Sequence, residues 1–289
     1  MSFYDKQYKA LVQNIVQNGY SDKGQNVRTV WADGTPAHTL STISEKLVFD
    51  CKEVPILTTK RVAWKSAIHE LLWFYVHRTS KADYLDENNV KIWREWTRSD
   101  NTIGRAYGYQ LGKPIRTGNW KVNPVSGHVS FEFTNQVERL IQGLINDPAS
   151  RRHIITLNNI DDAWDMALQP CVWHNQWLVK NGKLHLIVGV RSNDVALGQP
   201  FNVFQYYVLL RMIAQITGYE VGTVTFNIND CHIYDRHIDP LLDQIELEGF
   251  KAPELWINPD VKNFDDFTID DFKLIGYEHH PSIKMEVAI

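Results

Sequence analysis

The chain has 289 residues, 44% of them hydrophobic, and a formal net charge of -4 at pH 7. The apolar fraction is ample for a substantial core, whereas the small negative charge excludes a general attraction to nucleic acid or acidic membranes, so any phosphate site must be a local cluster of arginines. The three cysteines, Cys51, Cys171 and Cys231, are too widely spaced to predict a disulfide scaffold, a metal site or a redox pair.

The N-terminal segment predicts a helix over residues 3–18, because Leu11, Ile15 and Val16 follow helical spacing and Gly19 ends the pattern. The same segment lacks the apolar run of a signal peptide. No stretch of the chain approaches the roughly 20 apolar residues of a membrane span. We therefore expect a cytoplasmic protein.

Two short segments follow this helix. Residues 27–30 form a polar loop, in which Arg28 is by default a solvated surface charge. Residues 40–49 alternate loosely, as a strand does, and residues 55–60 indicate a short connection.

Residues 62–77 follow a helical pattern that carries one acidic residue among apolar ones. Glu70 lies three residues after Ala67 and four before Phe74, so its carboxylate is placed on a largely apolar face. Burial there raises a carboxyl pKa and suits a proton donor or acceptor near neutral pH. The alternative is a glutamate at the edge of that face that reaches water.

Trp93 and Trp96 are three residues apart and would share a helix face, either as core residues or as a wall on which a ring system stacks. Residues 104–112 are rich in glycine and tyrosine. Residues 113–128 contain two prolines and two glycines and indicate an irregular insertion without a clear pattern.

Helical spacing resumes at residues 136–145, and a strand pattern follows at residues 153–157. Arg151 and Arg152 stand directly before this strand. Adjacent guanidinium groups suit a bidentate anion site, although a surface pair held by ion pairs is the commoner outcome.

Cys171 is expected at the beginning of a strand, because Pro170 holds the preceding backbone extended and an apolar, aromatic-rich pattern follows directly. Asn181 and Gly182 separate this strand from a second one at residues 184–190. They predict a two-residue hairpin turn, in which both positions need a positive φ.

The turn sets the register of the two strands. Lys180 should lie opposite Lys183, and counting outward brings Cys171 opposite Ser192 if no bulge intervenes. Residues 191–194 are thus delivered beside the cysteine, where the Arg191 guanidinium would favour thiolate over thiol and make a usable nucleophile. The alternative is a buried structural cysteine.

Residues 198–202 predict the start of a helix with a proline near its first turn, and residues 203–216 predict that it is buried centrally, because they are apolar nearly all round. Asn202, at the mouth of this helix, would be costly to bury without partners for both its donor and its acceptor. Residues 224–228 alternate as one face of a strand, and His232 and Tyr234 continue the same parity. Both side chains are therefore expected to point inward, either into a pocket or into the core.

The chain ends with a strand region at residues 265–275 and an apolar tail at residues 285–289, which we expect to be docked. No repeat, low-complexity tract or convincing linker is apparent in the sequence. A single domain over residues 1–289, with a variable insertion near residues 113–128, is therefore expected.

Taken together, these residues resemble the thymidylate synthase family from Arg28 to Ile289. The similar segments are residues 69–74, 87–90, 150–152, 170–171, 191–194, 197–198, 200–202, 230–234 and 287–289. The resemblance implies an α+β fold, layered as an α/β sandwich around a mixed, largely antiparallel sheet, and a homodimer with shared active sites. It also implies the conversion of dUMP and 5,10-methylenetetrahydrofolate, a co-substrate, to dTMP and dihydrofolate, without a metal ion.

The resemblance assigns a role to each matching position. Cys171 would be the nucleophile, and Glu70 would manage protons. Asn202 would read the uracil edge, and His232 and Tyr234 would hold the sugar hydroxyl. The other substrate-binding residues would be Arg28, Tyr107, Arg191, Ser192, Asn193 and Asp194, with Arg151 and Arg152 reaching the phosphate from the partner subunit. Folate would lie against Trp93, Asp194, Leu197, Gly198 and Phe201, with Ala288 and the C-terminus closing over it.

The sequence departs from the common family pattern at Val172, Val190 and residues 157–159, which are marks of a divergent branch close to a type found in some bacilli and their phages. One alternative is a deoxyuridylate hydroxymethylase, which uses the same folate without hydride transfer. Another is an inactive nucleotide or RNA binder. Asn202 argues against a cytosine substrate, and the complete set of nucleophile, carboxylate and phosphate arginines argues against the binder.

Overall fold

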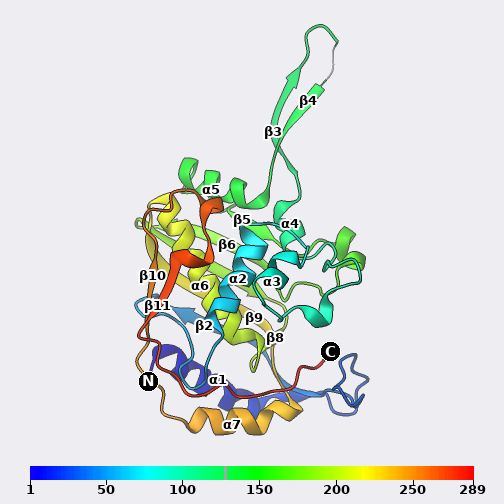
Figure 1. Ribbon diagram of the computed structural model, residues 1–289, viewed down its shortest axis with the longest axis vertical. Helices are drawn as coiled ribbons and strands as arrows, with labels where there is room; N and C mark the ends of the chain where they lie inside the picture. Colours follow the sequence, from blue (N-terminus) through cyan, green and yellow to red (C-terminus); the bar gives the residue numbers. More distant parts are fainter. Residues whose placement is uncertain (127–128) are drawn as a thin grey trace.

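The computed structural model describes residues 1–126 and 129–289, and within them a seven-stranded sheet organises the fold (Figure 1). β7 and β8 run parallel to β9, and the remaining pairs are antiparallel. The mixed, largely antiparallel sheet of an α+β fold is therefore confirmed. The strand order is β1 (Tyr20–Ser21), β2 (Thr39–Phe49), β9 (Glu220–Tyr234), β7 (Lys183–Val190), β6 (Val172–Lys180) and β5 (Ile154–Thr156), with β8 (Asn193–Asp194) beside β9.

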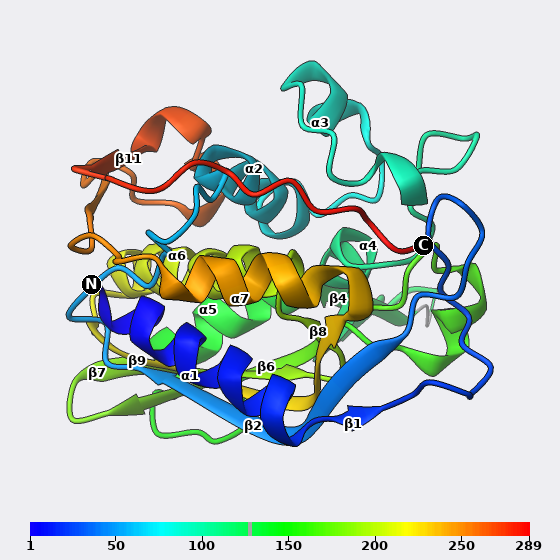
Figure 2. The same cartoon turned by 90° about the horizontal axis from the view of Figure 1, so that it is seen from below.

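Helices cover one face of the sheet. The central helix α6 (Gly198–Thr217) is buried along most of its length, as its apolar surface predicts, and α2 (Trp64–Tyr75) packs against it. Along the edge formed by β2, α1 (Phe3–Asn18) lies beside α7 (Ile238–Glu246) (Figure 2). Over residues 1–126 and 129–289, no helix combines the length and apolar character needed to cross a membrane.

Shorter elements complete the molecule. The shorter helices are α3 (Asp83–Glu87), α4 (Gly108–Gly112) and α5 (Gln136–Asn146). Three 3-10 turns border the regions discussed below: η1 (Arg94–Trp96) between α3 and α4, η2 (Ile160–Asp165) between β5 and β6, and η3 (Asp235–His237) between β9 and α7. The remaining 3-10 turns are η4 (Phe264–Asp266) and η5 (Ile269–Asp271), and the strands β10 (Glu254–Ile257) and β11 (Phe272–Ile275) form a separate pair. The predicted strand region at residues 265–275 is thus a strand only at its end.

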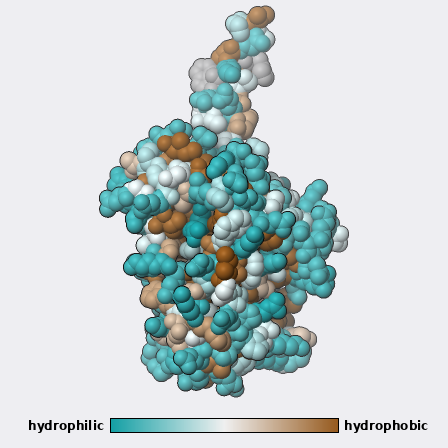
Figure 3. Space-filling model, turned by 60° about the vertical axis from the view of Figure 1, so that its left-hand side comes forward, coloured by the Kyte–Doolittle hydropathy of each residue, from teal (hydrophilic) through white to brown (hydrophobic). Residues whose placement is uncertain are grey.

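The insertion expected near residues 113–128 projects from the body of the molecule (Figure 1). Part of it, residues 127–128, lies outside the described residues. The expectation of an irregular segment was wrong for β3 (Ile115–Val122), which pairs with β4 (Val129–Thr134). Both hydrophobic and hydrophilic side chains lie on the surface of this hairpin (Figure 3). Because β4 is exposed along most of its length, no burial imposes the alternation by which a strand is recognised in sequence.

The hairpin between β6 and β7 has the predicted turn but not the predicted register beyond it. Asn181 and Gly182 have φ angles of 51° and 74°, and Lys180 lies opposite Lys183. A bulge at Trp173 then adds one residue to β6, which moves the pairing by one position. As a result, the Arg191 amide donates to the Cys171 carbonyl at 2.8 Å. Cys171 therefore lies opposite Arg191 and not opposite Ser192.

The apolar C-terminal tail is docked, as expected. It runs across the molecule and ends beside the loop at residues 29–37 (Figure 2). The amide of Val30 donates to the Ile289 carbonyl at 2.8 Å, and the amide of Ile289 donates back at 3.0 Å. The last residue is thus held by backbone hydrogen bonds in both directions.

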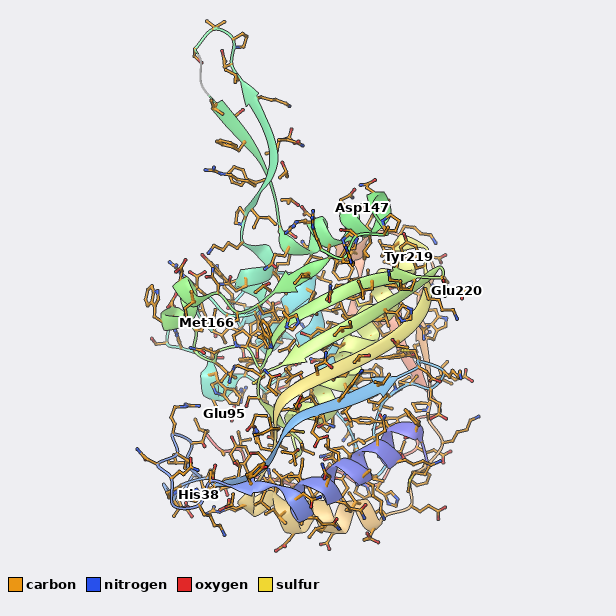
Figure 4. The ribbon with its side chains drawn as sticks, turned by 180° about the vertical axis from the view of Figure 1, so that it is seen from behind. His38, Glu95, Asp147, Met166, Tyr219 and Glu220 are labelled. Carbon is orange, nitrogen blue, oxygen red and sulfur yellow. The ribbon has the colours of Figure 1, made fainter. Side chains whose placement is uncertain are left out.

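The second face of the sheet carries side chains but no covering helix among the described residues (Figure 4). Ile43 on β2 is 71% exposed, and Ile154 on β5 is 44% exposed. Along β6 and β7, fully buried residues alternate with half-buried ones. An uncovered sheet face that bears large apolar side chains is a feature of surfaces that another protein covers.

Candidate active site

Two neighbouring cavities open beside Cys171. The small cavity, about 180 Å³, is lined by Glu70, Leu71, Phe74, Tyr75, Ile92, Trp93, Trp96, Tyr107, Leu168, Cys171, Val172, Gly198, Asn202, Gln205 and Tyr206. The wide cavity, about 700 Å³, is lined by Arg28, Glu95, Trp96, Thr97, Arg98, residues 166–169, Arg191 and Ile289. Trp96 and Leu168 line both, so one ligand can extend from the first cavity into the second.

Cys171 lies directly before β6, at the strand entry predicted from Pro170. Its amide donates to the Tyr107 hydroxyl at 3.0 Å. Burial raises the pKa of the Cys171 thiol above its ordinary value of 9.0, and the Arg191 guanidinium opposes that shift. The predicted effect of Arg191 is therefore present, but burial outweighs it. The free protein holds a thiol at neutral pH, and that thiol must lose its proton when it attacks.

Glu70 lies inside the apolar face of α2, as its spacing predicts, and its carboxylate lines the same small cavity as Cys171. The indole N–H of Trp93 and the amide of Gln205 both donate to this carboxylate. Burial raises the pKa of Glu70 above its ordinary value of 4.5, while these two hydrogen bonds lower it. A carboxyl group held in this way can exchange a proton at a fixed place.

Aromatic rings form a wall of the small cavity. Trp93 and Trp96 contact each other with ring centroids 5.7 Å apart, but Trp93 precedes and Trp96 ends a 3-10 turn, so they do not share the face of an α-helix. Tyr107 stacks on Phe74 at 4.5 Å with an angle of 7° between the rings. Tyr107 has a φ of 39°, an unfavourable backbone angle for a bulky residue. The stacking and the hydrogen bond from Cys171 hold it there.

Asn202 lines the small cavity at the beginning of α6, one helical turn after Gly198. Over residues 1–126 and 129–289, its side-chain amide has no hydrogen-bond partner. By contrast, Gln205, on the next turn of the helix, donates both to the Ala67 carbonyl at 2.9 Å and to Glu70. The donor and the acceptor of Asn202 are therefore free for a ligand.

The wide cavity brings together Arg28 and Arg191, which are far apart in sequence. The Arg191 Nε and Nη2 atoms donate to the carbonyls of Pro170 at 3.0 Å and Gln169 at 2.7 Å. This guanidinium thus fixes the backbone that leads into Cys171. Arg98 lines the same cavity but is paired with Asp165 at 2.6 Å. Arg28 and Arg191 thus form the local cationic site that the net charge of the chain does not indicate.

Ser192 is half-buried beside Arg191 and lines neither cavity. The carboxylate of Asp194 accepts from the amides of Ala196 at 2.8 Å and Leu197 at 3.2 Å, and so shapes the loop before α6. Asn193 is buried, and its amide donates to Gln199 at 2.6 Å. The structure therefore does not bring the Asn193 side chain to either cavity, and its substrate role stays a prediction.

His232 and Tyr234 lie at the end of β9 with ring centroids 5.2 Å apart, in line with the predicted parity. The Nδ1 atom of His232 lies 2.7 Å from the Asp230 carboxylate. Arg28 lies near enough to Tyr234 to lower the pKa of its phenol, although burial raises that pKa to about 12. Tyr234 is half-buried, and neither it nor His232 lines one of the two cavities, so their contact with the sugar hydroxyl stays a prediction.

The predicted folate residues are only partly brought together. Trp93 and Gly198 line the small cavity. Leu197, Phe201 and Ala288 are half-buried and line neither cavity, and Ile289 at the end of the tail lines the wide one. Their contacts with a folate stay predictions.

Arg151 and Arg152 are exposed and lie away from both cavities of their own chain. β5 pairs with β6 through Ile154 and Gln176, and the Gln176 amide donates to the Arg151 carbonyl at 2.9 Å. Figure 4 shows Asp147, which precedes this turn, far from Glu95 and Met166 of the wide cavity. Neither arginine lines a cavity of its own chain, and their contact with a phosphate bound by a partner subunit stays a prediction.

Two polar side chains that hold parts of the site in place escaped the sequence reasoning: Gln205, which binds Glu70, and Lys60, which binds the loop before α6. Gln205 is a polar residue in an otherwise apolar helix, three positions after Asn202, and that spacing was the available signal. Lys60 is buried, donates to the Ala196 carbonyl at 2.6 Å, and has its pKa lowered to about 8 by burial. No spacing or motif in the connection at residues 55–60 indicated that this lysine would be buried.

Comparisons with known proteins bear on the whole chain. The family model described as thymidylate synthase matches residues 6–289. The chain is 56% identical over 290 residues to thymidylate synthase 1 of Bacillus spizizenii and 55% identical to thymidylate synthase of Bacillus phage phi3T, with 100% of both chains covered in each case. It also matches the solved structure of thermostable thymidylate synthase A from Bacillus subtilis, with a TM-score of 0.90, 56% identity and 100% of both chains covered.

Proposed function

Because the chain belongs to the thymidylate synthase family, we propose that dUMP lies across its two cavities, with the pyrimidine in the small cavity and the phosphate in the wide one. The enzyme is a methyltransferase that forms dTMP from dUMP with the one-carbon unit of methylenetetrahydrofolate. The hydroxymethylase alternative is not favoured. The resemblance to bacillus and phage enzymes agrees with the relatives described above.

One observation supports this placement above all others. The small cavity is lined by a thiol, a buried carboxyl and a free amide, and it adjoins a cavity lined by three arginines, Arg28, Arg98 and Arg191. The amide of Asn202 accepts from the ring N–H of uracil and donates to a ring carbonyl. Arg28 and Arg191 neutralise the phosphate, and charge-assisted bonds of this kind are about twice as strong as neutral ones.

The chemical step begins at Cys171. Its sulfur forms a bond to the pyrimidine, the ring double bond breaks, and the electron pair moves to the adjacent carbonyl oxygen, so that the neighbouring carbon becomes an enolate-like nucleophile. Because burial holds the thiol pKa high, the thiol proton passes to the Glu70 carboxylate in the same cavity as the sulfur attacks. Glu70, held by Trp93 and Gln205 across the same cavity, is placed to manage protons on the ring.

Methylenetetrahydrofolate supplies the one-carbon unit and the hydride when it is bound. The chain fits a flat ring there, because Ile92, Trp93 and Trp96 form an apolar aromatic wall and Gly198 carries no side chain to fill the cavity. Lys60 and Asp194 shape the loop beside that wall. The tail that ends in Ile289 lies at the rim and excludes water from the reacting atoms.

A homodimer with shared sites is part of the proposal. The uncovered sheet face supplies a surface for a second copy, and the exposed Arg151 and Arg152 line neither cavity of their own chain. Cys171→Ser and Arg151→Ala subunits each damage a different half of a shared site. A mixed dimer then contains one intact site, and refolding the two inactive variants together restores roughly a quarter of wild-type activity, since about half of the dimers are mixed. Demonstrated subunit exchange without recovered activity would remove Arg151 from the site.

The reaction is tested by mass analysis of the product from dUMP and methylenetetrahydrofolate, together with the amount of dihydrofolate formed. We expect dTMP and dihydrofolate in equal amounts. A product that carries a hydroxymethyl group, with tetrahydrofolate returned, would transfer the protein to the hydroxymethylase class. The cytoplasmic location stays a prediction from the sequence.

A further inference from the structure

Three segments that are remote in sequence meet around the guanidinium of Arg236 in η3. Its Nη2 atom donates to the Asp33 carboxylate at 2.6 Å and to the Thr35 hydroxyl at 2.9 Å. Its Nη1 atom donates to the Glu286 carboxylate at 2.8 Å. We call Arg236, Asp33, Thr35 and Glu286 the arginine clasp, because one planar group holds the loop at residues 29–37 and the C-terminal tail together.

The loop is also anchored at its base. The Arg236 guanidinium lies over the Trp31 ring, 4.9 Å from its centroid, and the indole N–H of Trp31 donates to Asp235 at 3.1 Å. Trp31 is only 2% exposed. Across the loop, the amide of Ala37 donates to the Thr29 carbonyl at 3.0 Å. The loop thus has a fixed shape, and the clasp sets its orientation relative to the end of β9.

The tail is fixed by the same carboxylate that Arg236 binds. Glu286 accepts from the amide of Ala32 at 2.9 Å, and its carbonyl lies 2.7 Å from the His237 Nε2 atom. Three residues later, the tail pairs with Val30 through the backbone of Ile289. Glu286 therefore connects the tail to the loop directly as well as through Arg236.

The clasp lies next to the phosphate site without belonging to it. Arg28, just before the anchored loop, and Ile289, at the end of the anchored tail, both line the wide cavity, whereas Arg236 does not. We propose that Arg236 is a positioning residue for the substrate phosphate, which holds the loop and tail so that Arg28 faces the wide cavity. This inference rests on the proposed binding of dUMP.

Arginine suits this role because its planar fork donates in two directions at once, whereas a lysine ammonium is a point charge on a flexible stem. The Arg236 side chain is 38% exposed, and Asp33 is 53% exposed. Ion pairs this exposed contribute little individually and are weakened by salt. The expected effect on phosphate binding is therefore moderate, about three- to tenfold.

The test compares ligands with and without a phosphate on Arg236→Ala, in the full-length enzyme. We expect the dissociation constant of dUMP and the inhibition constant of inorganic phosphate to rise about three- to tenfold, while kcat/KM for deoxyuridine stays unchanged. Arg236→Lys should restore part of the loss. Lys9→Ala is a matched control, because the Lys9–Glu246 pair at 3.2 Å joins α1 to α7 on the surface; it should leave all three constants unchanged.

Three outcomes would overturn the proposal. These are unchanged phosphate binding in Arg236→Ala, an equal loss for dUMP and deoxyuridine, and no recovery in Arg236→Lys. Arg191→Ala separates this failure from a failure of the proposed site. If Arg191→Ala weakens phosphate inhibition and Arg236→Ala does not, the proposed role of Arg236 is wrong and the phosphate site stands. If neither variant weakens phosphate inhibition, the phosphate does not bind in the wide cavity.

Discussion

The small cavity and the wide cavity are built in opposite ways. The small one is walled mainly by α2, α6 and the entry of β6, and its carboxyl group already accepts two hydrogen bonds. The wide one is walled by loops and by the last residue of the chain. The side chains proposed for the chemical step thus come mainly from buried helices and a strand. The arginines proposed to bind the phosphate come from loops at the surface, which contact one another.

Because of this difference, substitutions in the two cavities should impair the enzyme in different ways. A change in the small cavity removes a group that no neighbour can replace, because each of its polar groups holds one fixed place among packed side chains. A change in the wide cavity removes one of several positive charges near solvent, and the remaining charges still attract the phosphate. We therefore expect the first kind to reduce kcat and the second to raise the KM for dUMP.

The largest effect should follow Cys171→Ser. Serine keeps the shape but is a much weaker nucleophile than a thiol, so turnover should fall by at least about 10⁴-fold while dUMP still binds to a folded protein. Single-turnover kinetics and dUMP titration measure the two properties. Cys51→Ser is the control, since Cys51 is a half-buried free cysteine that lines neither cavity. A Cys171→Ser rate within tenfold of wild type would remove Cys171 as the nucleophile.

Glu70→Gln should come next, with kcat lowered about 10²- to 10⁴-fold and the dUMP dissociation constant little changed. Because burial raises the pKa of Glu70 above 4.5, a rate that depends on its carboxylate falls as the pH drops through that raised pKa. The acid limb of the wild-type kcat profile should therefore disappear from the residual activity of the variant. An acid limb that persists in Glu70→Gln would assign the titration to another group.

Asn202→Asp should change specificity more than rate. A mispaired polar group in the small cavity costs about 1 to 3 kcal/mol, so preference for dUMP over dCMP should fall about 5- to 150-fold. The ratio of kcat/KM for the two nucleotides measures it. Unchanged discrimination would mean that another group reads the uracil edge.

The two cavities also differ in how far the sequence predicts them. Cys171, Glu70 and Asn202 stand out because each is a polar group at a defined place in an apolar pattern, and burial of that pattern brings them together. The bulge at Trp173 was not predictable, since nothing in the local sequence shows where a strand takes an extra residue. That single residue decides whether Arg191 or Ser192 faces Cys171.

Contacts across long sequence separations escaped prediction for a different reason. Gln205 and Glu70 are 135 residues apart, and Arg236 and Asp33 are 203 residues apart. Local periodicity carries no information on such pairs. Arg28 accordingly looked like an ordinary surface charge until the resemblance assigned it a phosphate, and only the fold places it beside Arg191.

The smallest effect should follow Arg28→Lys. This variant tests whether a residue of the wide cavity affects phosphate binding alone. Lysine keeps the charge but loses the bidentate geometry, and Arg191 still faces the phosphate, so the KM for dUMP should rise only about threefold with kcat unchanged. Because this cavity is open to solvent, raising the salt from about 0.05 to 0.5 M should weaken dUMP in both proteins and reduce the difference between them. Deoxyuridine, which has no phosphate, should show no such dependence. A loss in kcat, or a salt effect as large for deoxyuridine as for dUMP, would show that Arg28 acts on the small cavity and that the two cavities are not functionally separate.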